Sequence, residues 1–293
     1  MGYLFLAAAL LFGVIKGYCG KRTSGYTKRI YDAVCANILR MIVCICIGAG
    51  AAVAAGGVDS FRVDGRILAI TALSGLSTAV FVVSWLIAVK KGAYMLVDVF
   101  CMLGLSVPIF GSTLLFSEHV GLNKWIGIAV LVLAAVILCS YNNSIKTKLT
   151  LSSVLLLTLC GLANGTSDFS QKLFVENAAG TSTLVFNFYT YLFALIGLCV
   201  CIPFFKPRQN SEKTDFKPVF GYILVMSVCL FLNTYTKTKA AEYLPSAELY
   251  PLSQGGALVL STGMSALFFG ERLTFKCIVG VVIAFAALLM INL

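Results

Sequence analysis

Several charged residues lie inside long apolar runs of this sequence, where ionised groups are expensive. Arg40 lies about ten residues into the run over 31–54, which is about 15 Å along a helix. If that run crosses a bilayer, a charge at this depth costs about 2.5–3.5 kcal/mol even on the lenient insertion scale. A guanidinium suits an anion or a carboxylate, and the structural alternative is an anchor for backbone carbonyls. Asn37 shares the helix face of Arg40, so both are candidates for a binding site.

Two carboxylates form a second set of candidates. Asn164, Asp168 and Gln171 follow at i, i+4 and i+7, which gives one polar stripe on a helix. Such a stripe on an apolar helix faces a cavity or other helices rather than lipid. Glu248 is expected at a similar depth, and two nearby carboxylates could share a proton at a coupling site. Alternatively, Asp168 pairs with Lys237.

A third set consists of Lys16 and Asp98, which lie in runs that are predicted to cross in opposite directions. Both should then lie about 9 Å from the same boundary, where a pair costs less than two separate charges. We therefore expect an inner gate that opens when the pair separates. In the alternative, Lys16 extends its ammonium to the interface.

Polar and aromatic residues at helical spacing extend these patterns. Most aromatic side chains in a helical membrane bundle serve packing or the interface, so these are weaker candidates for substrate contact. They are Asn187 and Tyr191, Asn233 and Tyr235, and Trp85.

The composition indicates what positions these residues. Of 293 residues, 59% are hydrophobic and only 12% are charged, which is too apolar for a soluble domain and too apolar for disorder. The net charge of +10 comes from short clusters between apolar runs, so it indicates topogenic charge rather than nucleic-acid binding. The chain is predicted to be a polytopic membrane protein in the lipid bilayer, and a soluble enzyme is excluded.

The apolar runs predict an all-α fold with ten transmembrane helices, because each run is about 20 residues long and nearly free of charge. Lysine and arginine are more frequent in the connections after the odd-numbered runs, which places those connections in the cytoplasm and both termini outside. The predicted spans are 2–20, 31–54, 67–89, 93–116, 124–142, 150–171, 182–205, 218–238, 245–269 and 274–292.

The two halves of the chain look alike. The stretch from Glu118 to Gly127 aligns with the stretch from Glu271 to Gly280, and each follows a helix end rich in Leu and Phe. Upstream, the stretch from Ala88 to Phe100 aligns with the stretch from Ala241 to Ser253, and Lys16 aligns with Asp168. Three coincidences in register indicate a duplication, with one five-helix repeat over 1–144 and another over 145–293. Because five is an odd number, the second repeat must enter from the opposite side, as inverted repeats in transporters do.

This pattern resembles the EamA domains of the drug/metabolite transporter (DMT) superfamily. The resemblance rests on the ending of each half, Pro108 to Gly127 and Glu271 to Gly280, and on Arg40 near the start of the second span. Phe12-Gly13 stands where the family often has Trp-Gly. The resemblance implies secondary transport of small metabolites, often export, without ATP.

We therefore expect a secondary transporter in the cell (plasma) membrane that works by alternating access as an exporter or exchanger of small polar metabolites, with protons as a candidate coupling ion. No cofactor or metal site is predicted, and the oligomeric state stays open. The alternative within transport is efflux of small cationic drugs, which Asp168 and Glu248 would suit. Two alternatives come from other classes. A membrane-embedded transferase needs clustered His or Asp motifs that the chain lacks. A passive scaffold would give one fixed pattern of accessibility, which substrate or pH would not change.

Overall fold

The computed structural model describes residues 1–27, 29–90, 100–140, 151–178, 180–205, 216–269 and 275–292. Within these ranges the chain forms ten α-helices and no strand, with three short 3-10 turns between them. The helices are α1 (Gly2–Ser24), α2 (Ile30–Gly56), α3 (Gly65–Lys90), α5 (Ser106–Phe116), α6 (Leu122–Ser140), α7 (Leu151–Asn177), α8 (Thr183–Cys201), α9 (Phe220–Ala241), α10 (Ser246–Phe269) and α11 (Phe275–Asn292).

Each helix overlaps a range that the apolar runs predict, although some helices extend beyond it, and the all-helical fold is confirmed for the described residues. The fourth run is interrupted: Phe100–Gly104 is helical, Leu105 forms a turn, and α5 begins at Ser106. Pro108 explains the interruption, because it has no N–H to donate to Gly104 and its ring clashes with that carbonyl. The nearby N–H of Ile109 bonds to the carbonyl of Leu105 at 3.3 Å.

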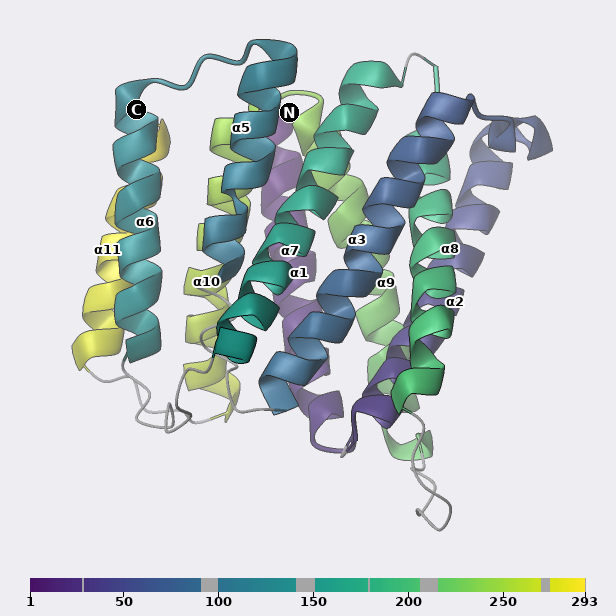
Figure 1. The fold of residues 1–293 in the computed structure, drawn as a ribbon, viewed down its shortest axis with the longest axis horizontal. Coiled ribbons are helices and arrows are strands. Elements are labelled where there is room, and N and C mark those ends of the chain that lie inside the picture. The colour runs from purple at the N-terminus through teal and green to yellow at the C-terminus, as the bar shows by residue number, and fades with distance from the viewer. Residues whose placement is uncertain are drawn as a thin grey trace.

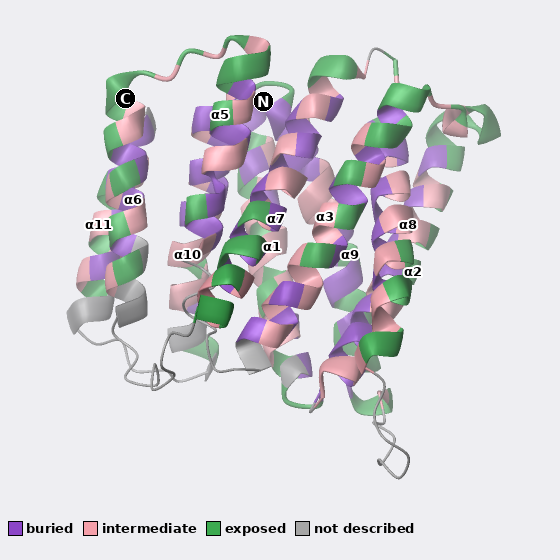
Figure 2. Ribbon diagram, in the orientation of Figure 1, coloured by how far each residue is buried: buried purple, intermediate pink, exposed green. Residues whose placement is uncertain are grey.

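In the part of the chain that the structure describes, five helices are long and apolar enough to cross a bilayer. Their spans are Gly2–Thr23, Ile30–Gly56, Gly65–Ala88, Thr183–Phe205 and Lys217–Ala241. Shorter apolar helices cover Phe100–Phe116, Leu122–Ala134 and Ile278–Ile291. Exposed, half-buried and buried residues alternate along the helices (Figure 2). Large apolar residues such as Leu11, Leu155 and Val282 are among the exposed ones. An exterior of this kind fits lipid better than water.

The helices stand side by side in two layers (Figure 1). One layer contains α6, α5, α7, α3 and α8, and the other contains α11, α10, α1, α9 and α2. Within the layers α1 packs against α9 and α3 against α7, and across the layers α2 packs against α8 and α6 against α11. Helices from the two halves of the chain are therefore packed against each other rather than separated into two bodies. The N- and C-termini lie at the same face of the bundle (Figure 1).

Glycines allow the closest helix contacts. A Cβ added to Gly161 or Gly165 of α7 would overlap the carbonyl oxygens of Phe100 and Gly104, and a Cβ on Gly104 would overlap the carbonyl of Gly161. Gly161 and Gly165 are four residues apart, so they present one smooth face to the segment that leads into α5. This contact fixes the position of the middle of α7, and Asp168 follows Gly165 by less than one turn.

Polar side chains are buried together with the apolar core. Asp168 of α7 is 3% exposed, Lys237 of α9 is 9% exposed, and Asn187 of α8 is fully buried. Gln171 and Thr238 are buried as well. Burying such groups is unfavourable unless they have partners, so their contacts show where the fold has organised polar chemistry.

Candidate functional site

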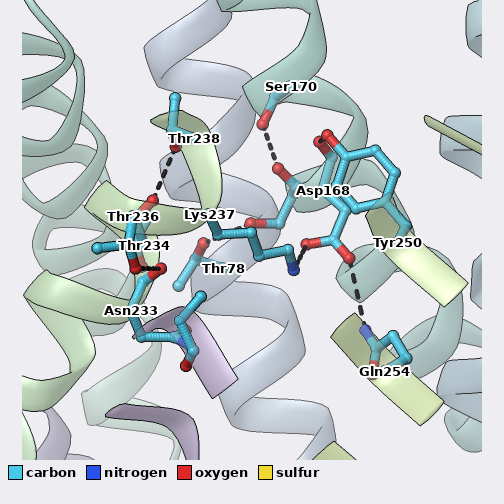
Figure 3. Close-up of polar contacts among 12 residues, drawn as sticks. Thr78, Asp168, Ser170, Asn233, Thr234, Thr236, Lys237, Thr238, Tyr250 and Gln254 are labelled. Carbon is cyan, nitrogen blue, oxygen red and sulfur yellow. Dashed lines mark hydrogen bonds and ion pairs between the residues drawn. The ribbon is translucent and has the colours of Figure 1, made fainter. Parts of the chain in front are cut away.

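An ion pair joins α7 to α9 inside the bundle (Figure 3). Lys237 Nζ donates to Asp168 Oδ1 at 2.6 Å, and the two side chains are only 11% and 5% exposed. Gln254 Nε2 of α10 lies 3.4 Å from Asp168 Oδ2, and the Tyr250 hydroxyl donates to the backbone carbonyl of Asp168 at 2.7 Å. Lys237 Nζ also lies 5.5 Å from the centre of the Tyr250 ring. The structure therefore contains the pair of Asp168 and Lys237, which the sequence offered as the alternative to two nearby carboxylates.

The polar face of α9 follows from its spacing. Asn233 and Lys237 are four residues apart, so both lie on the same side of the helix. Asn233 Nδ2 donates to the carbonyl of Ala9 in α1 at 2.6 Å, which ties α9 to α1. Thr236 and Thr238 bond to carbonyls of their own helix, at 2.7 Å to Leu232 and 2.9 Å to Thr234. These hydroxyls are satisfied locally, whereas Lys237 reaches across to α7.

Arg40 of α2 is held by its own helix. Arg40 Nη1 donates to Asn37 Oδ1 at 2.5 Å, and Asn37 Nδ2 donates to the carbonyl of Ala33 at 2.7 Å. Asn37 therefore orients the guanidinium, as the shared face predicted. Arg40 Nε is buried and has no hydrogen-bond partner among the described residues.

Lys16 of α1 interacts electrostatically with the Arg40 guanidinium and with the ion pair of Asp168 and Lys237. The groups that interact electrostatically with Arg40 include Cys44 and Tyr191, neither of which is a carboxylate. Helices α1, α2, α7 and α9 together supply this charged centre, which we define as Lys16, Arg40, Asp168 and Lys237. Asp98, the predicted gate partner of Lys16, lies outside the described residues.

The other predicted residues divide into buried polar groups and packing groups. Gln171 Oε1 and both amide atoms of Asn187 are buried without a partner in the described part of the chain. The Tyr191 hydroxyl is 2.8 Å from Thr234 Oγ1 and donates to the Leu230 carbonyl at 3.2 Å. Asn164 is half-buried on the stripe of α7.

Tyr235 and Trp85 are half-buried and pack against apolar clusters. Tyr235 lies against the cluster that contains Met41 and Phe231, and Trp85 lies against clusters that contain Leu86 and Leu157. Both side chains therefore contribute to packing, which is the more common role of aromatic residues in such bundles.

Glu248 belongs to a different group of charges. It forms an ion pair with Lys124 at the start of α6, and the Tyr3 hydroxyl of α1 donates to Glu248 Oε2 at 3.1 Å. The sequence placed Glu248 beside Asp168, but each of the two carboxylates has a lysine of its own. Glu248 lies near the first turn of α10, so its partners come from neighbouring helix ends rather than from the middle of α7.

An ionic network at the end of α7 was missed by the sequence reasoning. Lys172 Nζ contacts Glu118 Oε1 and Glu176 Oε1, both at 2.9 Å. Glu118 Oε2 also accepts from the backbone N–H of Ser246 at 2.9 Å, which satisfies a free donor at the N-terminus of α10. The i, i+4 spacing of Lys172 and Glu176 was a usable signal, whereas Glu118 is distant in sequence and carried none.

Comparison with known proteins supports the predicted EamA-like fold. Residues 151–293 match the family model described as "EamA-like transporter family". A solved structure titled "Crystal structure of protein" has a TM-score of 0.79 and 14% sequence identity, and the match covers 99% of this chain and 95% of that chain. At this identity the likeness establishes the fold alone. A search of curated proteins gave no match.

The family assignment agrees with the charged centre in an apolar helical bundle. Members of this family are transporters rather than enzymes, and the apolar helices agree with a multi-pass membrane protein. The second half of the chain, residues 151–293, is thus similar to the EamA-like transporter family of the drug/metabolite transporter superfamily.

Proposed function

We propose that the chain is a secondary transporter of small polar metabolites that works by alternating access in the plasma membrane, as an exporter or exchanger. The observation that carries this proposal is the charged centre inside an apolar bundle, because ionised groups are retained at such depth only when they serve a task or have partners. The centre draws on helices from both halves of the chain, and binding sites in transporters built from inverted repeats lie at that interface.

The helix contacts support two inverted repeats over 1–144 and 145–293. If α1, α2, α3, α5 and α6 correspond to α7, α8, α9, α10 and α11, several of the main helix contacts have counterparts. The contact of α1 with α9 corresponds to that of α7 with α3, and the contact of α1 with α10 corresponds to that of α7 with α5. The pairs α2 with α8 and α6 with α11 join equivalent helices. A two-fold relation between the halves accounts for this pattern.

The depths of the charges also support a central site. Arg40 lies ten residues after the start of α2, about 15 Å along the helix, and Asp168 lies nine residues before the end of α7, about 14 Å. These two helix ends belong to opposite faces of the bundle (Figure 1). In a hydrocarbon core about 30 Å thick, both residues are therefore expected close to the midplane.

The ion pairs of Glu248 and Glu118 support the proposal that the bundle is closed at one of its two faces. They link α6, α7 and α10 with the start of α1 and with the segment before α6, through Lys124 and Lys172. Access from that face would require these pairs to separate. Asp168 is the candidate proton carrier, because its protonation would weaken the bond to Lys237 and free the ammonium.

A metabolite-uptake screen in proteoliposomes tests the proposal. Purified protein is reconstituted, a pH gradient is imposed, and uptake of a metabolite mixture is compared with empty liposomes. We expect accumulation of a small polar solute, and we expect Asp168→Asn to lose proton-driven uptake while it remains monodisperse on gel filtration.

The matched control is Lys239→Gln, which alters a partly exposed pair with Glu242 rather than the charged centre. No uptake of any solute by the wild-type protein would contradict the transport proposal. Normal proton-driven uptake by Asp168→Asn would remove Asp168 from the coupling mechanism.

A further inference from the structure

The charged centre contains more positive than negative groups among the described residues. Lys16, Arg40 and Lys237 are cationic, and Asp168 is the carboxylate that faces them. We propose that the substrate carries an anionic group and that Arg40 and Lys16 receive it. This inference rests on the proposed transport function and specifies the class of substrate.

Asp168 is already engaged by other groups. Its Oδ1 accepts from Lys237 at 2.6 Å, and Gln254 Nε2 lies 3.4 Å from its Oδ2. Its charge is thus largely compensated by Lys237 rather than by the other two cations. In the described residues Arg40 and Lys16 have no carboxylate in ion-pair contact.

Arg40 has the geometry to bind an anion. A guanidinium has five N–H donors in a planar fork that matches a carboxylate or a phosphate in two parallel bonds. Asn37 accepts one bond from Nη1 and fixes the plane, while Nε is buried without a partner in the described part of the chain. A buried donor that lacks a partner is unfavourable, so an acceptor supplied by a ligand would stabilise this arrangement.

Lys16 strengthens the preference for a negative ligand. It lies within electrostatic range of both Arg40 and Lys237, and like charges repel strongly where water is scarce. An anion between Lys16 and Arg40 would convert this repulsion into attraction. A cationic solute would increase it, which argues against the drug-cation alternative.

Binding to purified protein in detergent tests the inference. Sodium succinate and sodium phosphate serve as anionic probes and tetraethylammonium chloride as the cationic probe, all at one ionic strength. Thermal protection and calorimetric titration report binding. We expect at least one anionic probe to bind the wild-type protein and the cationic probe to give no protection.

Variants locate the site. Arg40→Gln and Lys16→Gln should each weaken binding of the anion at least tenfold, and Lys239→Gln should leave it unchanged. Arg40→Lys keeps the charge but loses the fork, so it should bind with intermediate affinity and also serves if Arg40→Gln does not fold. The inference is overturned if neither anion binds the wild-type protein, if the cationic probe binds instead, or if Arg40→Gln binds the anion normally.

Transport data separate the two proposals. In one outcome, the protein binds no anion but its proteoliposomes take up a neutral or cationic solute. This result would support the transport function and refute the anionic substrate class. Anion binding without uptake of any solute would refute the transport function instead.

Discussion

The ion pair between Asp168 and Lys237 leads to a quantitative prediction about stability. Replacing Lys237 with methionine keeps the volume and removes the charge, which leaves the Asp168 carboxylate buried with Gln254 as its remaining side-chain contact among the described residues. Replacing Asp168 with leucine leaves the Lys237 ammonium buried beside the Tyr250 ring. The double variant removes both charges.

The magnitude follows from the geometry. At 2.6 Å and an effective dielectric constant of about 20, two unit charges attract by about 6 kcal/mol. Desolvation of both groups offsets most of this, so an intact buried pair contributes little net stability, whereas removing one partner costs about 3–5 kcal/mol. We therefore expect Lys237→Met to lower the free energy of unfolding by about 3–5 kcal/mol, and the double variant to lose much less than the sum of the single variants.

Equilibrium unfolding in mixed micelles, titrated with SDS and followed by circular dichroism, measures these differences. Lys239→Met is the matched control, because the Lys239–Glu242 pair is about one-third exposed and should contribute less than about 1 kcal/mol. If Lys237→Met costs less than about 1 kcal/mol, or if the two substitutions are additive, the side chains do not form a dry ion pair and the reasoning is refuted.

Two further substitutions test the packing around the site. Gly104→Ala should lower the free energy of unfolding by about 1–3 kcal/mol in the same titration, because the added Cβ would overlap the carbonyl of Gly161. The control is Gly221→Ala, where the added Cβ meets open space and should not destabilise the protein. Equal effects of the two substitutions would contradict the close contact at Gly104. Tyr191→Phe should cost about 1 kcal/mol, because it loses the bonds of a buried hydroxyl to Thr234 and to a backbone carbonyl; an unchanged melting temperature would argue against that hydroxyl contact.

The sequence predicted the helices well because hydropathy is a local property. Each apolar run is visible without knowledge of its neighbours, so each described helix overlaps an expected range, although some helices, such as α7, extend beyond it. The break at Leu105 was not predicted, although Pro108 was present, because a proline in an apolar helix can cause a kink, a break or neither. Pro251 illustrates this, since α10 continues through it.

The candidate site was predicted where the partners share a helix. Asn37 and Arg40 are three residues apart, and their predicted common face is seen as a hydrogen bond. Asp168 was recognised from its stripe on α7, but Lys237 is 69 residues away, so the pair was only one of two alternatives. Glu248 was assigned to the wrong group because Lys124, its partner, is 124 residues away. Contacts between helices depend on packing angles and rotations that residue spacing does not encode.

Accessibility of the interior tests the central claim most directly. Gln171 Oε1 is buried without a partner among the described residues, and we expect the proposed transport pathway to supply water to it. Leu155, on the same helix, is 62% exposed and is expected to face lipid. Gln171→Cys and Leu155→Cys are treated in proteoliposomes with a membrane-impermeant thiol reagent, and mass spectrometry locates the label.

We expect Gln171→Cys to be labelled much faster than Leu155→Cys, and we expect a bound substrate anion to slow that labelling. Labelling of Gln171→Cys no faster than Leu155→Cys from either side of the membrane would show that water does not reach the polar interior, and would contradict a transport pathway through it.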